Sequence, residues 1–252
     1  MTRIGNGQHE DASVCLTVVM PVYNEAGVIG EVLRAWLGAA DTLGVPYRLV
    51  VYDDGSIDDS PRLALECMDR RPDVVRVVRQ ANRGHGATLL RGYREAKSRW
   101  VLQVDGDGEV GSEILPELWR RREAHDLVVV ARRYGRRPLE RRIASAGARW
   151  LLKGLFDGRI QDPNSPCRLM RRDAVAPLLE RLAPTAAVPN LTLLAWAHRS
   201  GLRIAQVSSA AGPARAGGLK GMRLWRLAGR AIWEIVEVRL RRNALPLPRA
   251  GS

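Results

Sequence analysis

Short apolar runs alternate with longer amphipathic segments along the first 131 residues of the chain. The runs are apolar at nearly every position, which is typical of strands in a parallel sheet that is covered on both faces. The longer segments carry apolar residues at helical spacing, as 28–37 does. We expect strands over 15–22, 47–52, 74–78, 100–104 and 126–131. Because parallel strands are joined by right-handed crossovers, this pattern predicts a doubly wound, mostly parallel α/β sheet with helices on both faces.

The pattern is less regular in the second half of the chain. Helices are expected over 141–156, 174–182 and 191–200, and a strand is expected over 203–208. The sequence DPNSPCRLMRR, residues 162–172, predicts a loop that is broken by prolines at its start. Ligands of doubly wound sheets bind beyond the carboxyl ends of the strands. We therefore expect the functional site at that edge.

Composition narrows the class of protein. A hydrophobic content of 46% excludes a largely disordered chain. The polar amino terminus predicts no secretory signal, and no apolar run has the ~20 residues that span a bilayer. Three widely spaced cysteines suggest neither a disulfide framework nor a zinc site, which fits a reducing cytoplasm.

The charge of the chain indicates which partners to expect. The net charge is +13, and 37 of the 40 basic residues are arginine. Such a field favours nucleic acid, phosphorylated ligands or an anionic membrane surface as partners. Aromatic residues make up only 5% of the chain and are not interleaved with the arginines, so we expect no nucleic-acid partner.

Three carboxylates follow the apolar run 100–104 at every second position: Asp105, Asp107 and Glu109. If the strand continues through them, its alternation places all three side chains on one side at its carboxyl end. Converging carboxylates repel each other unless a cation joins them, and oxygen ligands suit Mg²⁺ or Mn²⁺. The alternative is an acidic, glycine-rich turn, since Asp-Gly is common turn chemistry.

Four segments in a fixed order extend this picture: MPVYNEAGVI, VVYDDGSIDDS, ANRGHGATLLRGYREA and VDGDG. Together they resemble the family 2 glycosyltransferases with the GT-A fold, and within that family the chain is similar to the dolichol- and polyprenyl-phosphate sugar synthases. The resemblance covers 14–239. It implies a disordered tail over 1–13 and a GT-A domain over 14–220, with a nucleotide-sugar half (14–131) and an acceptor half (132–220). An amphipathic helix and tail would occupy 221–252.

The resemblance also implies an activity, which is a metal-dependent, inverting transfer of a sugar to a polyprenyl phosphate from a donor of the GDP-mannose or UDP-glucose type. The donor-binding residues would be Pro21, Tyr23, Glu25, Asp53, Arg83, Gly84, Gly86, Asp105 and Arg133. Asp107 would be the main metal ligand, beside Asp105 and Glu109. His85 is expected to be a solvent-exposed loop residue rather than a catalyst.

Looser matches in the second half imply the acceptor site. Arg141, Ser145 and Arg215 would bind the acceptor phosphate, although ordinary helix surface is the alternative for the first two. Asp162 and Arg168 would be catalytic. Arg168 would either pair with Asp162 or bind phosphate. A phosphate acceptor is already anionic and needs no strong base, whereas a hydroxyl acceptor would need one, with Asp162 as the first candidate.

A long helix is expected over 222–242, in place of the transmembrane helices of many such synthases. Its polar arc is narrow, and its wide apolar arc suits a helix that packs on the protein with one part and on a membrane interface with another. Burial in the fold or in a homodimer contact is the alternative. We expect a cytoplasmic protein, peripheral on the inner face of the cell membrane.

Three rival functions remain at this point. The first keeps the class and changes the acceptor to a soluble hydroxyl compound, such as a secondary metabolite or a glycan. The second is a nucleotidyltransferase, and the third is an inactive nucleotide-sugar-binding subunit. The ordered YNE, DDGS and DGD motifs favour glycosyl transfer over the second, and the retained Asp105 and Asp107 argue against the third.

Overall fold

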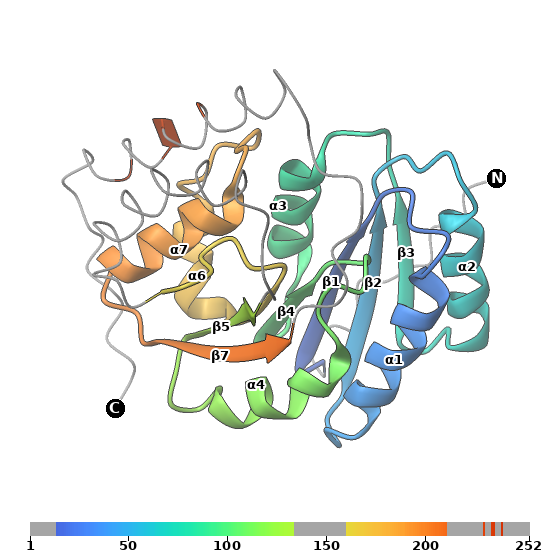
Figure 1. The fold of residues 1–252 in the computed structure, drawn as a ribbon, viewed down its shortest axis with the longest axis horizontal. Helices are drawn as coiled ribbons and strands as arrows, with labels where there is room; N and C mark the ends of the chain where they lie inside the picture. The colour runs from blue at the N-terminus through green and yellow to red at the C-terminus, as the bar shows by residue number, and fades with distance from the viewer. Residues whose placement is uncertain (1–13, 134–159, 211–228, 230–232, 235–237, 239–252) are drawn as a thin grey trace.

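A computed structural model of the protein describes residues 14–133, 160–210, 229, 233, 234 and 238 (Figure 1). Its described part forms one seven-stranded sheet in the order β3-β2-β1-β4-β6-β5-β7. The strands are β1 (Leu16–Val22), β2 (Tyr47–Asp53), β3 (Val75–Arg79), β4 (Trp100–Val104), β5 (Leu127–Arg133), β6 (Cys167–Arg171) and β7 (Ile204–Ala210). Neighbouring strands are parallel except at β6, which is antiparallel to both β4 and β5. The predicted fold class, a mostly parallel α/β sheet, is therefore confirmed.

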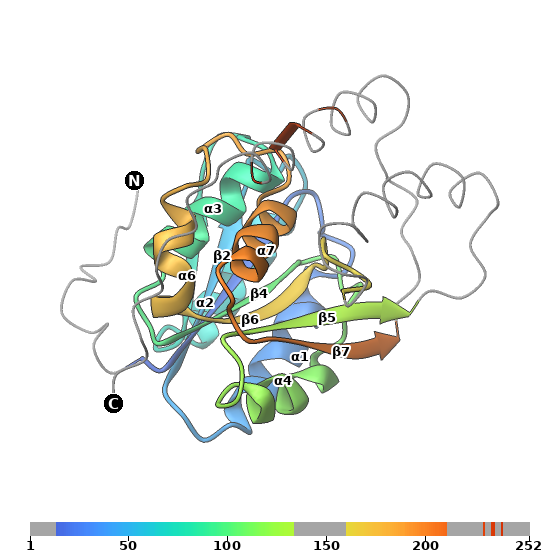
Figure 2. The same ribbon diagram turned by 90° about the vertical axis from the view of Figure 1, so that its left-hand side faces the viewer.

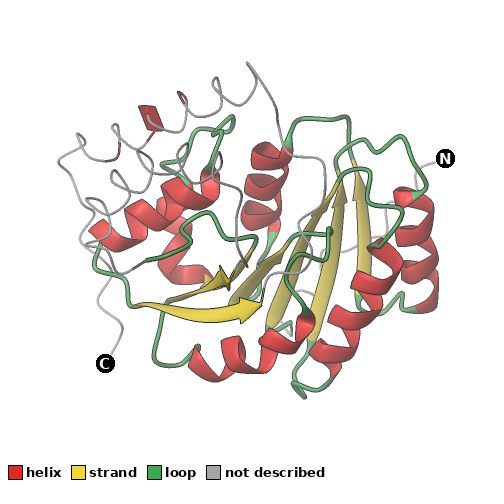
Figure 3. Ribbon diagram, in the orientation of Figure 1, coloured by secondary structure: helices red, strands yellow, loops and turns green. Residues whose placement is uncertain are grey.

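Helices cover both faces of this sheet (Figures 1 and 3). They are α1 (Ile29–Asp41), α2 (Ser60–Arg70), α3 (His85–Glu95), the short 3₁₀ helix η2 (Ser112–Ile114), α4 (Leu115–Arg121), α6 (Arg172–Leu179) and α7 (Pro189–Arg199). Side chains of α1, α2 and α4 share one apolar core, and those of α3, α6 and α7 share the other. The architecture is thus a three-layer sandwich with the sheet in the middle.

The apolar sequence of β1 explains why this strand lies in the buried middle layer. All seven of its residues are buried, and its side chains alternate between the two cores. Val18 and Met20 pack on the α1 side, whereas Val19 packs on the α3 side. Burying a side chain of this size is worth about 1.5–3 kcal/mol. The continuous apolar run predicted a strand covered on both faces, and this is what the structure has.

Strand β6 was not predicted by the sequence analysis, which expected only that the segment 162–172 starts as a loop broken by prolines. Cys167 and Leu169 face the α1 side, and Met170 faces the α3 side, so the segment has strand alternation. Strand β6 lies between β4 and β5 and forms hydrogen-bonded ladders with both of them. Beyond it, β5 and β7 lie side by side at the far edge of the sheet (Figure 2).

Several predicted elements lie outside the described residues. They are the tail 1–13, the helix 141–156, and most of the helix 222–242. Of that last helix the structure describes Trp233, which is 71% exposed, and Val238, which is buried in the core beside α7. No helix in the described part of the chain has the length and apolar character needed to cross a bilayer.

Candidate active site

A cavity of about 870 Å³ opens at the carboxyl ends of β1 and β4, where the amino-terminal end of α3 faces them. Five groups of residues line it. They are Pro21, Val22, Tyr23 and Glu25 at the end of β1 and just after it; Asp54; Asn82 to Leu89 around the start of α3; Asp105, Gly106, Asp107 and Arg132 at the ends of β4 and β5; and Asn164 and Pro166 before β6 together with Thr185 to Asn190 after it. The cavity therefore lies at the edge of the sheet where the sequence predicted a ligand.

Eight of the predicted site residues meet in this cavity: Pro21, Tyr23, Glu25, Arg83, Gly84, Gly86, Asp105 and Asp107. Asp53, Glu109, Asp162 and Arg168 are described but are not among its lining residues. Arg141, Ser145 and Arg215, together with the side chain of Arg133, lie outside the described residues. The roles of these last four stay predictions.

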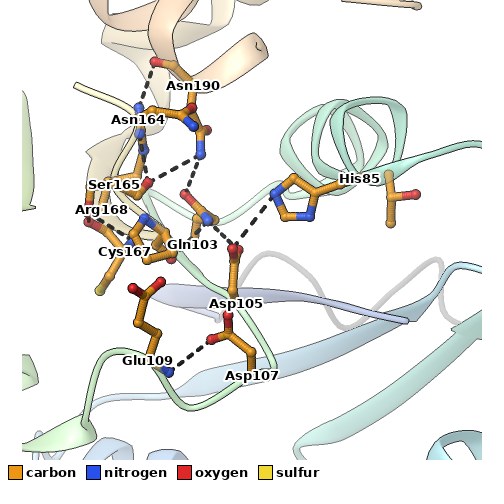
Figure 4. A network of polar contacts seen from close by, with 12 residues as sticks. His85, Gln103, Asp105, Asp107, Glu109, Asn164, Ser165, Cys167, Arg168 and Asn190 are labelled. Carbon is orange, nitrogen blue, oxygen red and sulfur yellow. Dashed lines mark hydrogen bonds and ion pairs between the residues drawn. The ribbon is translucent and has the colours of Figure 1, made fainter. Parts of the chain in front are cut away.

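The acidic segment is a turn, not a continuation of the strand, because β4 ends at Val104. One oxygen of Asp105 accepts a hydrogen bond from Gln103 Nε2 at 2.7 Å, and the other lies 3.7 Å from His85 Nε2 (Figure 4). Asp107 Oδ1 accepts the backbone N–H of Glu109 at 2.9 Å. The expectation that strand alternation aligns all three carboxylates is therefore wrong.

Glu109 takes a different direction from the other two acids. Its carboxylate pairs with Arg132 at 2.8 Å, and no group of three metal-ligating side chains is present among the described residues. Of the three acids in this segment, Asp105 and Asp107 line the cavity and Glu109 does not. Mg²⁺ is usually held by one or two carboxylates together with substrate phosphates, so two carboxylates fit such an ion without a third protein ligand.

The electrostatics of Asp105 favour a cation at this place. Burial raises the pKa of Asp105 above its ordinary value, the charge of His85 lowers it, and the nearby Asp107 raises it again. A bound divalent ion would offset both the burial and the repulsion between the two carboxylates. His85 was expected in a loop, but it begins α3 and lines the cavity.

Asp54 shapes the loop over the cavity. Its side chain is 3% exposed, and its two oxygens accept the backbone N–H groups of Arg83 and Gly84 at 2.8 and 2.9 Å. Asp53 is 1% exposed and accepts the N–H of Ser56 at 3.2 Å. Asp53 is the last residue of β2 and its side chain binds the turn that follows, and its predicted contact with the nucleotide base stays a prediction.

Asp162 and Arg132 form a bidentate ion pair at the cavity wall. Arg132 Nε donates to one carboxylate oxygen at 2.6 Å, and Nη2 donates to the other at 3.1 Å. The same guanidinium also binds Glu109. Both oxygens of Asp162 are therefore engaged by the guanidinium of Arg132. Sequence reasoning chose Arg133 in this segment and missed Arg132.

Arg168 does not make the pair with Asp162 that was one of its two predicted roles. Its side chain is fully buried, and its guanidinium donates to the carbonyl oxygens of Asn190, Pro163 and Ser165 at 2.8, 3.3 and 2.9 Å. Asp162 pairs with Arg132 instead. Arg168 therefore fastens the loop before β6 to the start of α7, and an enclosed guanidinium of this kind is not available to a phosphate.

The cavity wall formed by 185–190 was not anticipated from the sequence. An added Cβ on Gly86 would lie 2.5 Å from the carbonyl oxygen of Ala186, so this glycine lets α3 and the wall touch. On the other side, Glu234 accepts the N–H of Ala187 at 2.6 Å and the hydroxyl of Thr192 at 3.0 Å. Glu234 belongs to the polar arc of the predicted carboxyl-terminal helix, and it faces the protein rather than solvent.

Comparison with protein families decides which class the chain belongs to. Residues 17–179 match the model of the family described as glycosyl transferase family 2. The chain is a member of that family. The resemblance inferred from the four motifs is thereby confirmed, and the motifs of this glycosyltransferase family surround the cavity.

Relatives within the family share a common description. The chain is 30% identical over 179 residues to an undecaprenyl-phosphate 4-deoxy-4-formamido-L-arabinose transferase of Shewanella sediminis, covering 70% of this chain and 54% of the relative. It is 28% identical over 202 residues to the enzyme of the same name from Pseudomonas paraeruginosa, covering 79% and 60%. The chain thus spans a little over half the length of these curated relatives.

Solved structures agree on the fold. A crystal structure of glucosyl-3-phosphoglycerate synthase from Mycobacterium tuberculosis superposes with a TM-score of 0.69 at 23% identity, covering 90% of this chain and 81% of that one. The same enzyme in complex with Mn²⁺, UDP-glucose and phosphoglyceric acid gives a TM-score of 0.68 at 23% identity, covering 90% and 80%. At this level of identity the likeness supports the GT-A glycosyltransferase fold of the chain.

Proposed function

We propose that this family 2 glycosyltransferase moves a sugar from a nucleoside diphosphate sugar to a polyprenyl phosphate, with Mg²⁺ or Mn²⁺ held by Asp105 and Asp107. The observation that carries the proposal is the position of these two carboxylates in the cavity, at the end of β4. The curated relatives act, by their names, on undecaprenyl phosphate. The solved glucosyl-3-phosphoglycerate synthase complex contains Mn²⁺ and UDP-glucose.

The donor would occupy the side of the cavity between β1 and α3. Tyr23 and Glu25 line that side, and Tyr23 is 47% exposed, so its ring is accessible to a base or ribose. The loop at Arg83 and Gly84 is held in place by Asp54 and faces the same space. A divalent ion between Asp105 and Asp107 would stabilise the negative charge that develops on the departing diphosphate. Arg133 would assist from the end of β5.

The ion pair of Asp162 with Arg132 supports a phosphate acceptor over a hydroxyl acceptor. Transfer to a hydroxyl needs a base that removes its proton, and Asp162 was the first candidate for that role. Both oxygens of Asp162 accept hydrogen bonds from Arg132, and Asp162 is not among the residues that line the cavity. A phosphate acceptor is an anion already and attacks without such a base. Arg141, Ser145 and Arg215 remain the proposed contacts of that phosphate.

The charge and the carboxyl-terminal segment support a place at the membrane surface. The chain carries +13, and Trp233 is 71% exposed. Basic residues near an anionic leaflet contribute roughly 1 kcal/mol each, and tryptophan suits the interface between lipid and water. We propose a cytoplasmic, peripheral protein on the inner face of the cell membrane; a homodimer contact is the alternative role for the last helix.

Donor and metal binding can be tested by the melting temperature of the purified chain. We expect one of the UDP- or GDP-sugars, with Mn²⁺ or Mg²⁺, to stabilise the fold by about 2.7 kcal/mol at 100 times its dissociation constant. Asp107→Asn removes a charge without changing size and should abolish the metal-dependent part of that stabilisation. Asp173→Asn is the matched control, because this aspartate is 82% exposed. Equal metal-dependent stabilisation of the Asp107 variant and the wild type would contradict the proposed site.

A further inference from the structure

Gln103 is a polar side chain in an otherwise apolar strand. It is fully buried and projects from β4 toward the helices α3 and α7. Its amide makes contacts with four groups: Tyr93 Oη (3.1 Å), Asn190 Nδ2 (3.1 Å), the carbonyl oxygen of Pro166 (2.8 Å) and Asp105 Oδ1 (2.7 Å). Figure 4 shows Gln103 between Asn190 and Asp105. A buried amide with every polar atom engaged has a fixed orientation.

Backbone carbonyls determine which end of each amide is the donor. The carbonyl oxygen of Pro166 only accepts, so the atom of Gln103 that faces it, and that also faces Asp105, must be the nitrogen. The carbonyl oxygen of Ser165 likewise only accepts, so the nitrogen of Asn190 faces it and also faces Gln103 Oε1. These orientations follow from hydrogen-bond chemistry and do not depend on telling oxygen from nitrogen by position.

The contacts therefore form a directed chain of donors. The Tyr93 hydroxyl has one proton, which we assign to the shorter of its two contacts, Asn190 Oδ1 at 2.7 Å rather than Gln103 Oε1 at 3.1 Å. Asn190 Nδ2 then donates to Gln103 Oε1, and Gln103 Nε2 donates to Asp105 Oδ1. The chain starts on α3, passes through the start of α7 and ends at the carboxylate in the cavity. Asp105 Oδ2 remains on the side of His85 and the cavity.

We propose that Gln103 and Asn190 are positioning residues that hold Asp105 with one oxygen turned toward a divalent cation. This inference rests on the proposed metal-dependent function. Groups that hydrogen-bond a metal ligand orient it, and losing one typically weakens metal binding or activity by 10–100-fold. Asn190 also lines the cavity, so the wall beyond β6 and the metal-binding carboxylate are joined by a single amide.

Two substitutions reverse the direction of the chain at different points. Gln103→Glu puts a second carboxylate against Asp105 Oδ1, where the wild type has a donor. Asn190→Asp puts an acceptor against Gln103 Oε1, so the Gln103 amide either keeps an oxygen without its donor or turns over and presents that oxygen to Asp105 and the Pro166 carbonyl. The second variant leaves Asp105 and its direct partner unchanged in sequence. Gln206→Glu is the control. Gln206 lies on β7, and its Oε1 accepts the backbone N–H of Gln161, a hydrogen bond that a carboxylate can accept equally well.

Mn²⁺ binding is the readout, followed by the electron paramagnetic resonance signal of free Mn²⁺ during a titration without donor or acceptor. We expect both reversing variants to bind Mn²⁺ at least 10-fold more weakly than the wild type, and the control to stay within twofold. Unchanged Mn²⁺ affinity in either folded variant would overturn the inference. A wild type that binds no Mn²⁺ would contradict the proposed metal site itself, so the two failures are distinguishable.

A measurement on the wild type covers the case in which the variants do not fold. The side-chain amide protons of Gln103 should exchange slowly with solvent by NMR, because both are engaged in buried hydrogen bonds. Their resonances should broaden on addition of Mn²⁺ more strongly than those of Gln206, which lies three strands away in the sheet. Fast exchange, or the absence of broadening while the protein binds Mn²⁺, would also overturn the inference.

Discussion

Helix α3 touches the opposite cavity wall at Gly86, and Gly86→Ala is the change that tests this contact. The added Cβ would lie 2.5 Å from the carbonyl oxygen of Ala186 and 3.1 Å from Cδ of Pro189. Ordinary van der Waals contact begins at 3.4 Å, so the wall must retreat by about 0.9 Å from the helix. A backbone oxygen cannot move aside as the end of a long side chain can.

The expected cost follows from this overlap. Forcing an extra methyl group into a packed contact costs about 1–3 kcal/mol, and alanine returns up to about 1 kcal/mol through its better helix propensity. We expect a net loss of about 1–2 kcal/mol in the free energy of unfolding. At about 2–4 °C per kcal/mol for a chain of this size, the melting temperature should fall by about 2–8 °C.

The assay is differential scanning calorimetry with Gly38→Ala as the matched control. Gly38 lies in the middle of α1, and an added Cβ there meets nothing within 4 Å. That control should gain about 0.5–1 kcal/mol from helix propensity alone. Turnover of the Gly86 variant should also fall, by up to about 100-fold, because a displacement near 1 Å misplaces groups around the reacting atoms. A Gly86 variant that is as stable as the Gly38 variant would refute the reasoning.

Three further substitutions test parts of the structure outside the reacting centre. Asp126→Asn should cost about 1.5–3 kcal/mol, because Asp126 is 4% exposed and binds the charged Arg171 at 2.7 Å and Arg203 at 3.1 Å. Burial alone would raise the pKa of Asp126, but the hydrogen bonds and charges of these arginines hold it below its ordinary value. Because the pKa of Asp126 is lowered in the fold, this stabilisation is present above about pH 4 and should shrink as the pH falls further. Urea titrations measure the difference in unfolding free energy between wild type and variant. A difference that grows toward low pH would contradict the prediction. Glu234→Ala removes the acceptor of the Ala187 N–H and should lower the unfolding free energy by about 1–2 kcal/mol, as the loss of a helix cap does. Trp233→Ala is the control, because this side chain is 71% exposed, and it should change the unfolding free energy by less than about 0.5 kcal/mol. Equal effects of the two variants in thermal melts would argue against the contact between Glu234 and Ala187.

The sequence predicted the strands that are buried on both faces, because each of them appears in the sequence as a continuous apolar run. The apolar run 15–22 corresponds to β1, and the runs before Asp53 and Asp105 correspond to β2 and β4. The motifs at their ends met in one cavity because parallel strands bring their carboxyl ends to one edge. Both the fold class and this edge of the site were therefore accessible without coordinates.

Strand β6 and its neighbourhood were not accessible, for a physical reason. Arg168 occupies a fully buried strand position, and its partners are backbone carbonyls, which leave no mark in a sequence. Glu109 looked like a third ligand because spacing alone does not show that β4 has ended or that Arg132 lies within 2.8 Å. For both Arg168 and Glu109, the sequence analysis assigned a charged side chain to a role in the site. In the structure, each side chain is bound by other residues of the chain instead.

The central claim is metal-dependent transfer of a sugar to a polyprenyl phosphate. The most direct test incubates the purified chain with Mn²⁺ or Mg²⁺, a panel of UDP- and GDP-sugars, and undecaprenyl phosphate in anionic liposomes. Mass spectrometry then identifies any glycosylated lipid, with water-soluble alcohols as competing acceptors. The account predicts a glycosylated undecaprenyl phosphate that disappears with a chelator and with Asp107→Asn but persists with Asp173→Asn. Transfer to the soluble alcohols alone, or formation of the lipid product at the same rate without a divalent ion, would contradict it.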